Sequence, residues 1–260
     1  MDDTSVHGPL TRSVEDAALH MDICAGPHPL DPNSLPHPGY SYRSVLDELP
    51  QGLRAAYLPD LGYAVVQSDV ASVVEEAVGI LPDLGIEVEV VSGGPPEPGF
   101  DWGVSGSWEM LAQLHSMLPE HEDDFGRSFI RGVKLAANMT AERWGAMRRM
   151  RAELNAWCAR MFEQYDILLT PTIPYDAPPA RGPLASEVEG RPQPAANIGS
   201  FTMPFNLSWH PAGTVRAGMS KAGLPVGLQI VAPRHRDDRV LQVARAFERA
   251  TNCFSDWPDL

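Results

Sequence analysis

The fold is decided by a stretch that begins Tyr165-Asp166-Ile167-Leu168-Leu169-Thr170-Pro171-Thr172, a short apolar run stopped by proline. After a loop rich in Pro, Gly and Ala, it continues as Phe-Thr-Met-Pro-Phe-Asn-Leu-Ser-Trp-His-Pro-Ala at residues 201–212 and ends as Gly-Leu-Pro-Val-Gly-Leu-Gln-Ile-Val at residues 223–231. Short apolar runs bounded by Pro and Gly indicate buried strands, although periodicity alone leaves a buried helix open. A surface loop has no reason to be this apolar, so we predict that the stretch forms sheet and core.

A strand–helix–strand unit is predicted between residues 53 and 91. Residues 53–58 have the pattern of a strand, Ser68 is placed to cap a helix, and residues 86–91 have the alternation of a second strand. The helix has a buried stripe at helical spacing, made of Val70, Val73, Val74, Ala77, Val78 and Leu81. Because the connections on both sides of the helix are short, the two strands are expected to pair in parallel.

Helices are also predicted at the two ends of the chain. Ser13 is followed three residues later by Asp16, as in a capping box, and the helix it starts ends at Gly26-Pro27. A last helix follows Pro233, with Asp237 and Asp238 in its first turn, where acidic side chains suit the helix dipole.

The middle of the chain is predicted to be helical. Residues 102–137 form helical pieces that break near Pro119, and Thr140 caps a long helix over residues 141–164. That long helix has arginines away from its apolar line, which we interpret as a solvated outer face. These arginines are Arg143, Arg148, Arg149, Arg151 and Arg160.

Composition limits the classes of partner and compartment. The 260 residues have a net charge of −14, which argues against nucleic acid or an anionic membrane as a partner. No N-terminal apolar run resembles a signal peptide, and no apolar run reaches the roughly 18 residues of a membrane span, so a cytoplasmic location is expected. Three widely spaced cysteines without a Cys-x-x-Cys motif suggest neither a disulfide framework nor a zinc site.

Several motifs together resemble the C-terminal part of the amidase signature family, hydrolases of carboxylic amides that use a Ser-Ser-Lys triad. These motifs are Asp-Ile-Leu-Leu-Thr-Pro-Thr at 166–172, Thr-x-Pro-Phe-Asn-x-x-x-x-Pro-Ala at 202–212, Gly-Leu-Pro-Val-Gly-Leu-Gln-Ile-Val at 223–231, Ser-Val-His-Gly-Pro-Leu-Thr-Arg-Ser-Val at 5–14 and Gly-Leu-Arg-Ala-Ala-Tyr-Leu-Pro-Asp-Leu-Gly at 52–62. The resemblance implies an α/β fold with a mixed β-sheet flanked by helices on both faces. That fold would be incomplete relative to the full family fold, and residues 1–260 would form a single domain.

The catalytic residues of the family that this chain resembles are not found in this sequence. No Ser-Ser dipeptide occurs, and Lys134 and Lys221, the only lysines, do not have the context of the family's catalytic lysine. In the family, the lysine and both serines lie upstream of the motif that begins here at Ser5. We therefore expect no catalytic residue in this chain, and no activity from the chain by itself.

Other catalytic and cofactor patterns are weaker still. Residues 103–107 resemble a nucleophile elbow but lack the required second glycine and the preceding strand. His210 could act as a general base by the ordinary pKa of histidine, although a packing or loop role is the favoured interpretation. No His-x-x-x-His, glycine-rich dinucleotide motif or P-loop occurs, so neither a metal nor a cofactor is expected.

The remaining functional candidates belong to the wall of a substrate pocket. By resemblance, residues 196–206 lie near the substrate, and we predict Ile198, Gly199, Phe201 and Trp209 as wall residues, with plain core packing as the alternative for each. Family members that act on glutamine amides have an acidic residue where this chain has Gly199, so a less polar or larger amide is favoured. Arg216 also departs from the family, which usually has proline there.

Two hypotheses about function follow. In the first, the chain is the C-terminal portion of an amidase, and a small-molecule amide is its substrate once an N-terminal half completes the site. In the second, it is a non-catalytic protein that binds a small molecule or another subunit on an amidase-derived scaffold. A homo-oligomer is possible under either hypothesis.

Overall fold

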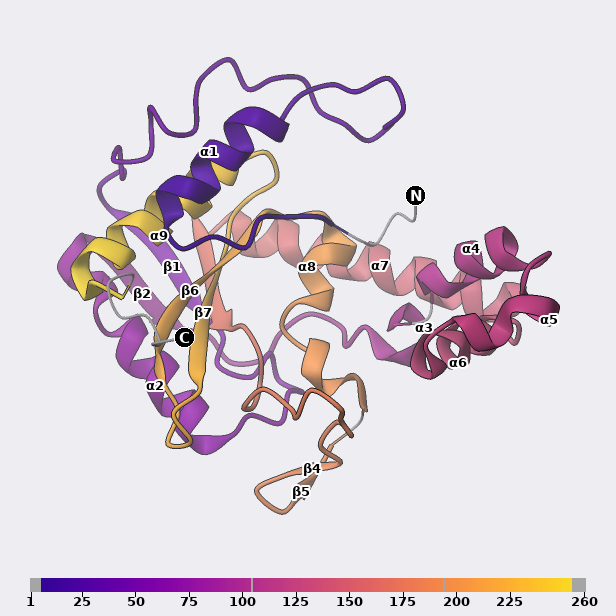
Figure 1. Ribbon diagram of the computed structural model, residues 1–260. Helices are drawn as coiled ribbons and strands as arrows, with labels where there is room; N and C mark the ends of the chain where they lie inside the picture. Colours follow the sequence, from indigo (N-terminus) through magenta and orange to yellow (C-terminus); the bar gives the residue numbers. More distant parts are fainter. Residues whose placement is uncertain (1–5, 104, 194, 254–260) are drawn as a thin grey trace.

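The computed structural model describes residues 6–103, 105–193 and 195–253. Its central sheet is mixed and has the strand order β2-β1-β3-β7-β6, and a small antiparallel hairpin stands apart from it (Figure 1). The sheet strands are β1 (Leu53–Tyr57), β2 (Ile86–Val90), β3 (Ile167–Pro171), β6 (Ala212–Met219) and β7 (Pro225–Val231), and the hairpin is β4 (Glu187–Val188) with β5 (Arg191–Pro192).

The strand–helix–strand unit is confirmed. Strands β1 and β2 pair in parallel, with Leu53 opposite Ile86, and α2 (Ser68–Val78) connects them through a short 3-10 turn, η1 (Leu81–Leu84). The predicted capping by Ser68 is wrong, because Gln67 is the N-cap residue and no side chain caps this helix. The Ser68 hydroxyl instead donates to the Glu189 carboxylate in the turn between β4 and β5.

Of the three apolar runs in the decisive stretch, the first and last form strands, and the middle one, which we expected to be sheet, forms mainly a helix. Strand β3 pairs antiparallel with β7, as the apolar runs indicate, but α8 (Met203–Ser208) occupies the middle run. Pro204 lies in the first turn of α8, where its missing N–H leaves no intrahelical hydrogen bond unmade. The strand begins after Pro211, as β6, which pairs antiparallel with β7.

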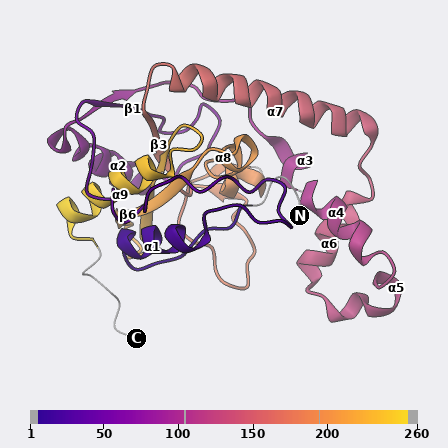
Figure 2. The ribbon, with the colours of Figure 1, turned by 90° about the horizontal axis from the view of Figure 1, so that it is seen from above.

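Helices cover both faces of the sheet. Gly213 of β6 lies opposite Ile230 and Gly218 lies opposite Val226, two residues on the same face of β7. The two glycines therefore share one face of the sheet, because a bulge between Arg216 and Gly218 shifts the register by one residue. A β-carbon at Gly213 would lie 2.7 Å from Val240 of α9 (Asp237–Thr251), and one at Gly218 would lie 2.8 Å from a valine of α2. Helix α8 lies over the opposite face, and α1 (Val14–Cys24) packs outside α9 (Figures 1 and 2).

The long helix α7 (Ala141–Phe162) leads from the sheet to a lobe of short helices (Figure 2). The Thr140 hydroxyl accepts from the Arg143 N–H, which confirms the predicted cap. The lobe has a small core of its own, formed by Leu118, Ile130 and Val133. Its elements are α3 (Gly99–Gly103), α4 (Ser105–Leu114), α5 (Leu118–His121), η2 (Glu122–Asp124) and α6 (Arg127–Ala136).

The N-cap of the first helix at Ser13 is also confirmed. The Ser13 hydroxyl accepts from the Asp16 N–H and donates to the Asp16 carboxylate. The first N–H of α1, that of Val14, donates to Glu248 of α9, which ties the two helices together. In the described parts of the chain, no helix is both long and apolar enough to cross a membrane.

The close approach of α9 to the sheet gives a first prediction. Gly213→Ala should lower the free energy of unfolding by about 1–3 kcal/mol, because the added methyl group overlaps Val240. Urea unfolding measures this change. Gly8→Ala is the matched control, since nothing lies within 4 Å of a β-carbon there. The double variant Gly213→Ala with Val240→Ala should lose less unfolding free energy than the two single variants lose together. Fully additive losses would contradict the proposed overlap.

Candidate functional site

The candidate site is built around the C-terminal end of α8. The Nε of Arg151 in α7 donates to the Leu207 carbonyl at 2.6 Å, and Arg234 donates to the Ser208 carbonyl through Nε and Nη2 at 2.8 and 2.7 Å. These carbonyls belong to the last turn of a helix, where acceptors lack intrahelical partners and carry partial negative charge. Two guanidinium groups from distant segments therefore cap α8.

The predicted solvated outer face of α7 is wrong for Arg151. Its side chain is buried, with 6% of the residue exposed, because α8 packs against this side of α7. The guanidinium carbon lies 4.7 Å from the ring centroid of Trp209 and 5.5 Å from that of Trp102. Burial of this charge is offset by the carbonyl and by the negative faces of two indoles.

Trp209 is placed by this arginine and by its own backbone. It is the C-cap residue of α8 and has φ 57°, in the left-handed region that few non-glycine residues adopt. One half of the residue stays exposed. Trp209 is therefore an aromatic side chain held in one place with a free surface, which suits a wall of a binding site.

The other predicted wall residues lie in two different environments. Gly199, in η3 (Ala195–Gly199), would place a β-carbon 3.5 Å from Met203, which packs on the cluster that contains Trp102 and Leu207. Ile198 beside it is half-buried. The structure therefore connects Gly199 to this cluster through Met203, whereas Trp209 is connected to Trp102 through the Arg151 guanidinium.

Phe201 lies in the main core instead. Its side chain has no exposed surface, and its carbonyl accepts from the Gln229 amide, which also donates to Thr170. This network joins the loop before α8 to strands β3 and β7. Contact of any of the four residues with a substrate stays a prediction.

His210 is part of the packing around α8. Its ring stacks on Phe162 with centroids 5.0 Å apart, and its Nδ1 lies 2.8 Å from the Ser208 hydroxyl. Burial, assisted by the positive charge of Arg234, lowers the pKa of His210 to about 4. The ring is neutral at pH 7 and sits among structural partners, which supports a packing role.

The remaining candidates from the sequence are also placed. The run at 103–107 joins α3 to α4, so helices rather than a strand precede and follow it, and residue 104 lies outside the described residues. Arg216 donates to the Cys253 carbonyl beyond α9. Within the described ranges, no group of three or more His, Cys, Asp or Glu side chains is arranged to hold a metal ion.

Arg151 and Arg234 are the residues of this site that the sequence did not single out. Arg151 was assigned to a helix surface, and no pattern marks an arginine that caps another helix. Only the crossing of α7 and α8 brings its guanidinium to the Leu207 carbonyl.

The mixed sheet with helices on both faces and a helical lobe at one end defines an α/β fold of the amidase type. A solved bacterial aryl acylamidase of the amidase signature family superimposes with a TM-score of 0.81 at 25% identity, over 95% of this chain and 54% of that one. The 6-aminohexanoate cyclic dimer hydrolase, solved with its substrate, superimposes with a TM-score of 0.77 at 27% identity, over 95% and 55%.

Sequence comparison agrees with the fold. The family model for amidases matches residues 2–241, so the chain belongs to the amidase signature family. It is 34% identical to an acylamidase of Rhodococcus erythropolis, over 93% of this chain and 51% of that protein. It is 32% identical to a subunit of the glutamyl-tRNA(Gln) amidotransferase of Thermus thermophilus, over 94% and 55%. The chain thus spans about half the length of the relatives it matches.

The arginine cap gives a second prediction. Arg151→Met should lower the free energy of unfolding by about 2–4 kcal/mol, because the buried Leu207 carbonyl loses its donor and Trp209 loses its cation. Urea unfolding tests this. Arg149→Met, an exposed arginine of the same helix, should change stability by less than about 0.5 kcal/mol. Equal effects of the two substitutions would argue against the cap.

His210 gives a third prediction. The pKa of His210 is about 4 in the folded protein, against an ordinary value of 6.5 that applies to the unfolded chain. Between pH 6.5 and pH 4, therefore, the imidazole takes up a proton mainly in the unfolded chain. Acidification from pH 7 to 5 should therefore remove about 2 kcal/mol of stability, with full stability above pH 6.5. His210→Phe keeps a ring beside Phe162 and should show a flatter pH dependence in urea unfolding. An unchanged slope would assign the loss to other groups.

Proposed function

We propose that residues 1–260 form, as a single domain, the C-terminal part of a hydrolase that cleaves the C–N bond of carboxylic amides. The Ser-Ser-Lys triad would come from a segment outside these residues, in the same polypeptide or a separate one. Membership of the amidase family supports this proposal, and so does the lack of any Ser-Ser dipeptide in the 260 residues. This chain would contribute pocket wall and scaffold rather than the nucleophile.

The two edges of the sheet carry the proposal. Strand β2 has exposed Glu87 and Glu89, charges that discourage a further strand from pairing with that edge. Strand β6, at the other edge, reads Ala-Gly-Thr-Val-Arg-Ala-Gly-Met, and Ala212, Thr214 and Met219 are exposed. The β2 edge is thus protected by exposed charges, whereas the exposed residues of the β6 edge are uncharged, as expected if further strands join the sheet at β6.

Apolar side chains left in solvent support the same proposal. Large exposed apolar residues are frequent in the first part of the chain, where little packs over them; among them are Val6, Leu10, Leu19, Ile23, Leu30 and Leu35. Leu10 and Leu30 are almost fully exposed, at 103% and 84%. These side chains are available to a further segment that packs on this part of the chain.

The substrate is proposed to be a large or weakly polar amide. Gly199 supplies no carboxylate to hold a substrate amino group, Trp209 offers a half-exposed apolar ring, and Ile198 is a half-buried apolar residue. The likeness to an acylamidase and to an aryl acylamidase is consistent with this choice.

A complementation experiment is the fourth prediction. The chain should be mixed with the part of the Rhodococcus erythropolis acylamidase that the match leaves uncovered, and hydrolysis of an aryl acylamide should be followed by colour. Turnover is expected only in the mixture, because neither part alone joins a nucleophile to the wall built around Trp209. Size-exclusion chromatography reports association separately from turnover.

Substitutions in this chain sharpen that test. Trp209→Ala should lower kcat/KM at least tenfold, since one aromatic contact contributes on the order of 1.5–3 kcal/mol and about 1.4 kcal/mol is tenfold. Trp144→Ala, another exposed tryptophan at 40%, should have no effect. Turnover by the chain alone, with a serine that can be trapped covalently, would overturn the proposal.

The alternative is a non-catalytic binding protein on the amidase scaffold. The same exposed β6 edge and the same missing dipeptide favour it as a second candidate. Stable association with the complementary part but no turnover of any amide would support this alternative over the first.

A further inference from the structure

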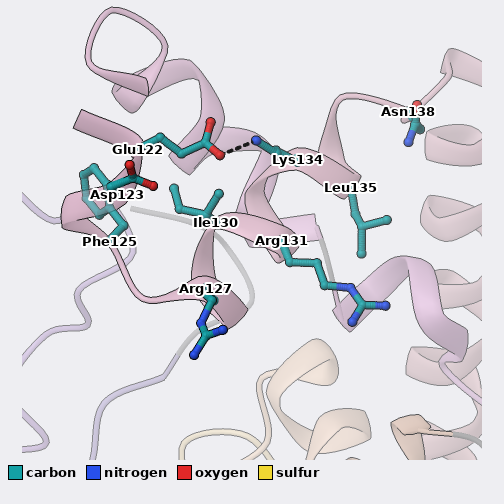
Figure 3. A pocket seen from close by; sticks show the side chains of 9 residues that line it. All are labelled: Glu122, Asp123, Phe125, Arg127, Ile130, Arg131, Lys134, Leu135 and Asn138. Carbon is teal, nitrogen blue, oxygen red and sulfur yellow. Dashed lines mark hydrogen bonds and ion pairs between the residues drawn. The ribbon is translucent and has the colours of Figure 1, made fainter. Parts of the chain in front are cut away.

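A pocket lies in the helical lobe, away from α8. It opens between η2 and α6 and has a volume of about 460 Å³ (Figure 3). Pockets that bind small molecules have volumes of about 300–1,000 Å³. Its size therefore suits a small organic ligand, and its lining decides which kind.

Two arginines on one side of the pocket are its distinctive feature. Arg127 and Arg131 are four residues apart on α6, so they share a face of the helix. Figure 3 shows both guanidinium groups extending to the same side of α6, away from Lys134. Both are exposed, and within the described parts of the chain no carboxylate pairs with either.

This lack of partners is notable in an acidic protein. The chain has 34 acidic and 20 basic residues, and other described arginines do find carboxylates, as Arg143 does with Asp101 and Arg245 with Glu248. Cations that share one pocket and form no ion pair with a carboxylate repel each other in the empty state. An anion held by both would relieve this repulsion.

The net charge of the lining points to a single negative charge. Lys134 lies 2.5 Å from Glu122, so these two charges offset each other. Asp123 then opposes the two arginines, which leaves a net charge of about +1 at the pocket. A dianion such as phosphate would meet the Asp123 and Glu122 carboxylates, whereas a monoanion would be matched.

The rest of the lining is apolar. Phe125 stacks on a neighbouring phenylalanine with centroids 5.7 Å apart, Ile130 is buried, and Leu135 is 38% exposed. These side chains would cover a hydrocarbon or aromatic body while its charged end meets the arginines. Planar guanidinium groups match the geometry of a carboxylate, with two parallel hydrogen bonds.

We propose that this pocket binds a monocarboxylate with an apolar body, such as an aryl-substituted alkanoic acid. Arg127 and Arg131 bind the carboxylate, and Phe125, Ile130 and Leu135 contact the body. The site is independent of the proposed amide hydrolysis, since it shares no residue with the wall around Trp209.

The fifth prediction tests this site by calorimetry with 4-phenylbutyrate. Binding is expected, and Arg127→Gln and Arg131→Gln should each weaken it at least tenfold, because hydrogen bonds to charged groups contribute about 1.5–3 kcal/mol. Arg149→Gln, an exposed arginine of α7 outside the pocket, should leave affinity unchanged. Leu135→Ser should weaken binding severalfold, and unfolding curves of all variants should match the parent because the substituted side chains are exposed.

Matched ligands and spectra complete the test. The neutral 4-phenylbutyramide should bind at least tenfold more weakly than the acid, and inorganic phosphate should not compete. Amide chemical-shift changes on addition of the acid should fall in residues 122–138. Equal binding of acid and amide, tighter binding of phosphate, no binding of the acid, or shift changes elsewhere would each overturn the proposal.

Discussion

The structure depends on how the last turn of α8 is satisfied. A six-residue helix buried between α7 and the sheet leaves carbonyls that water cannot reach, and an unpaired buried acceptor costs free energy. Arg151 and Arg234 supply the donors, one from α7 and the other from the segment after β7. The same arginines fix Trp209 and, through the charge of Arg234, add to the effect of burial in lowering the pKa of His210.

The sheet combines a protected edge with an open one. The exposed glutamates of β2 discourage pairing at one edge, whereas the exposed residues of β6 at the other edge carry no charge. The face that carries Gly213 and Gly218 is already covered by α9 and α2, which approach closely enough to exclude a methyl group.

The helical lobe differs from the sheet in its electrostatics. Around α8 each positive charge meets a carbonyl or an aromatic ring, whereas in the lobe Arg127 and Arg131 meet solvent within the described residues. Satisfied cations stabilise a fold, and unsatisfied ones in a pocket are available to a ligand. This difference separates the structural arginines of the chain from those we assign to binding.

The resemblance to a known family implied the class of fold. The sequence by itself determined the parallel pairing of β1 and β2 and the caps at Ser13 and Thr140, because these follow from local periodicity and capping chemistry. It also indicated the family from short motifs. It did not determine that residues 203–208 form a helix, since a short apolar run suits strand or helix equally. Nor did it determine that Arg151 is buried. The carbonyl that accepts from Arg151 belongs to Leu207, 56 residues further along the chain, and only the crossing of α7 and α8 brings the two together.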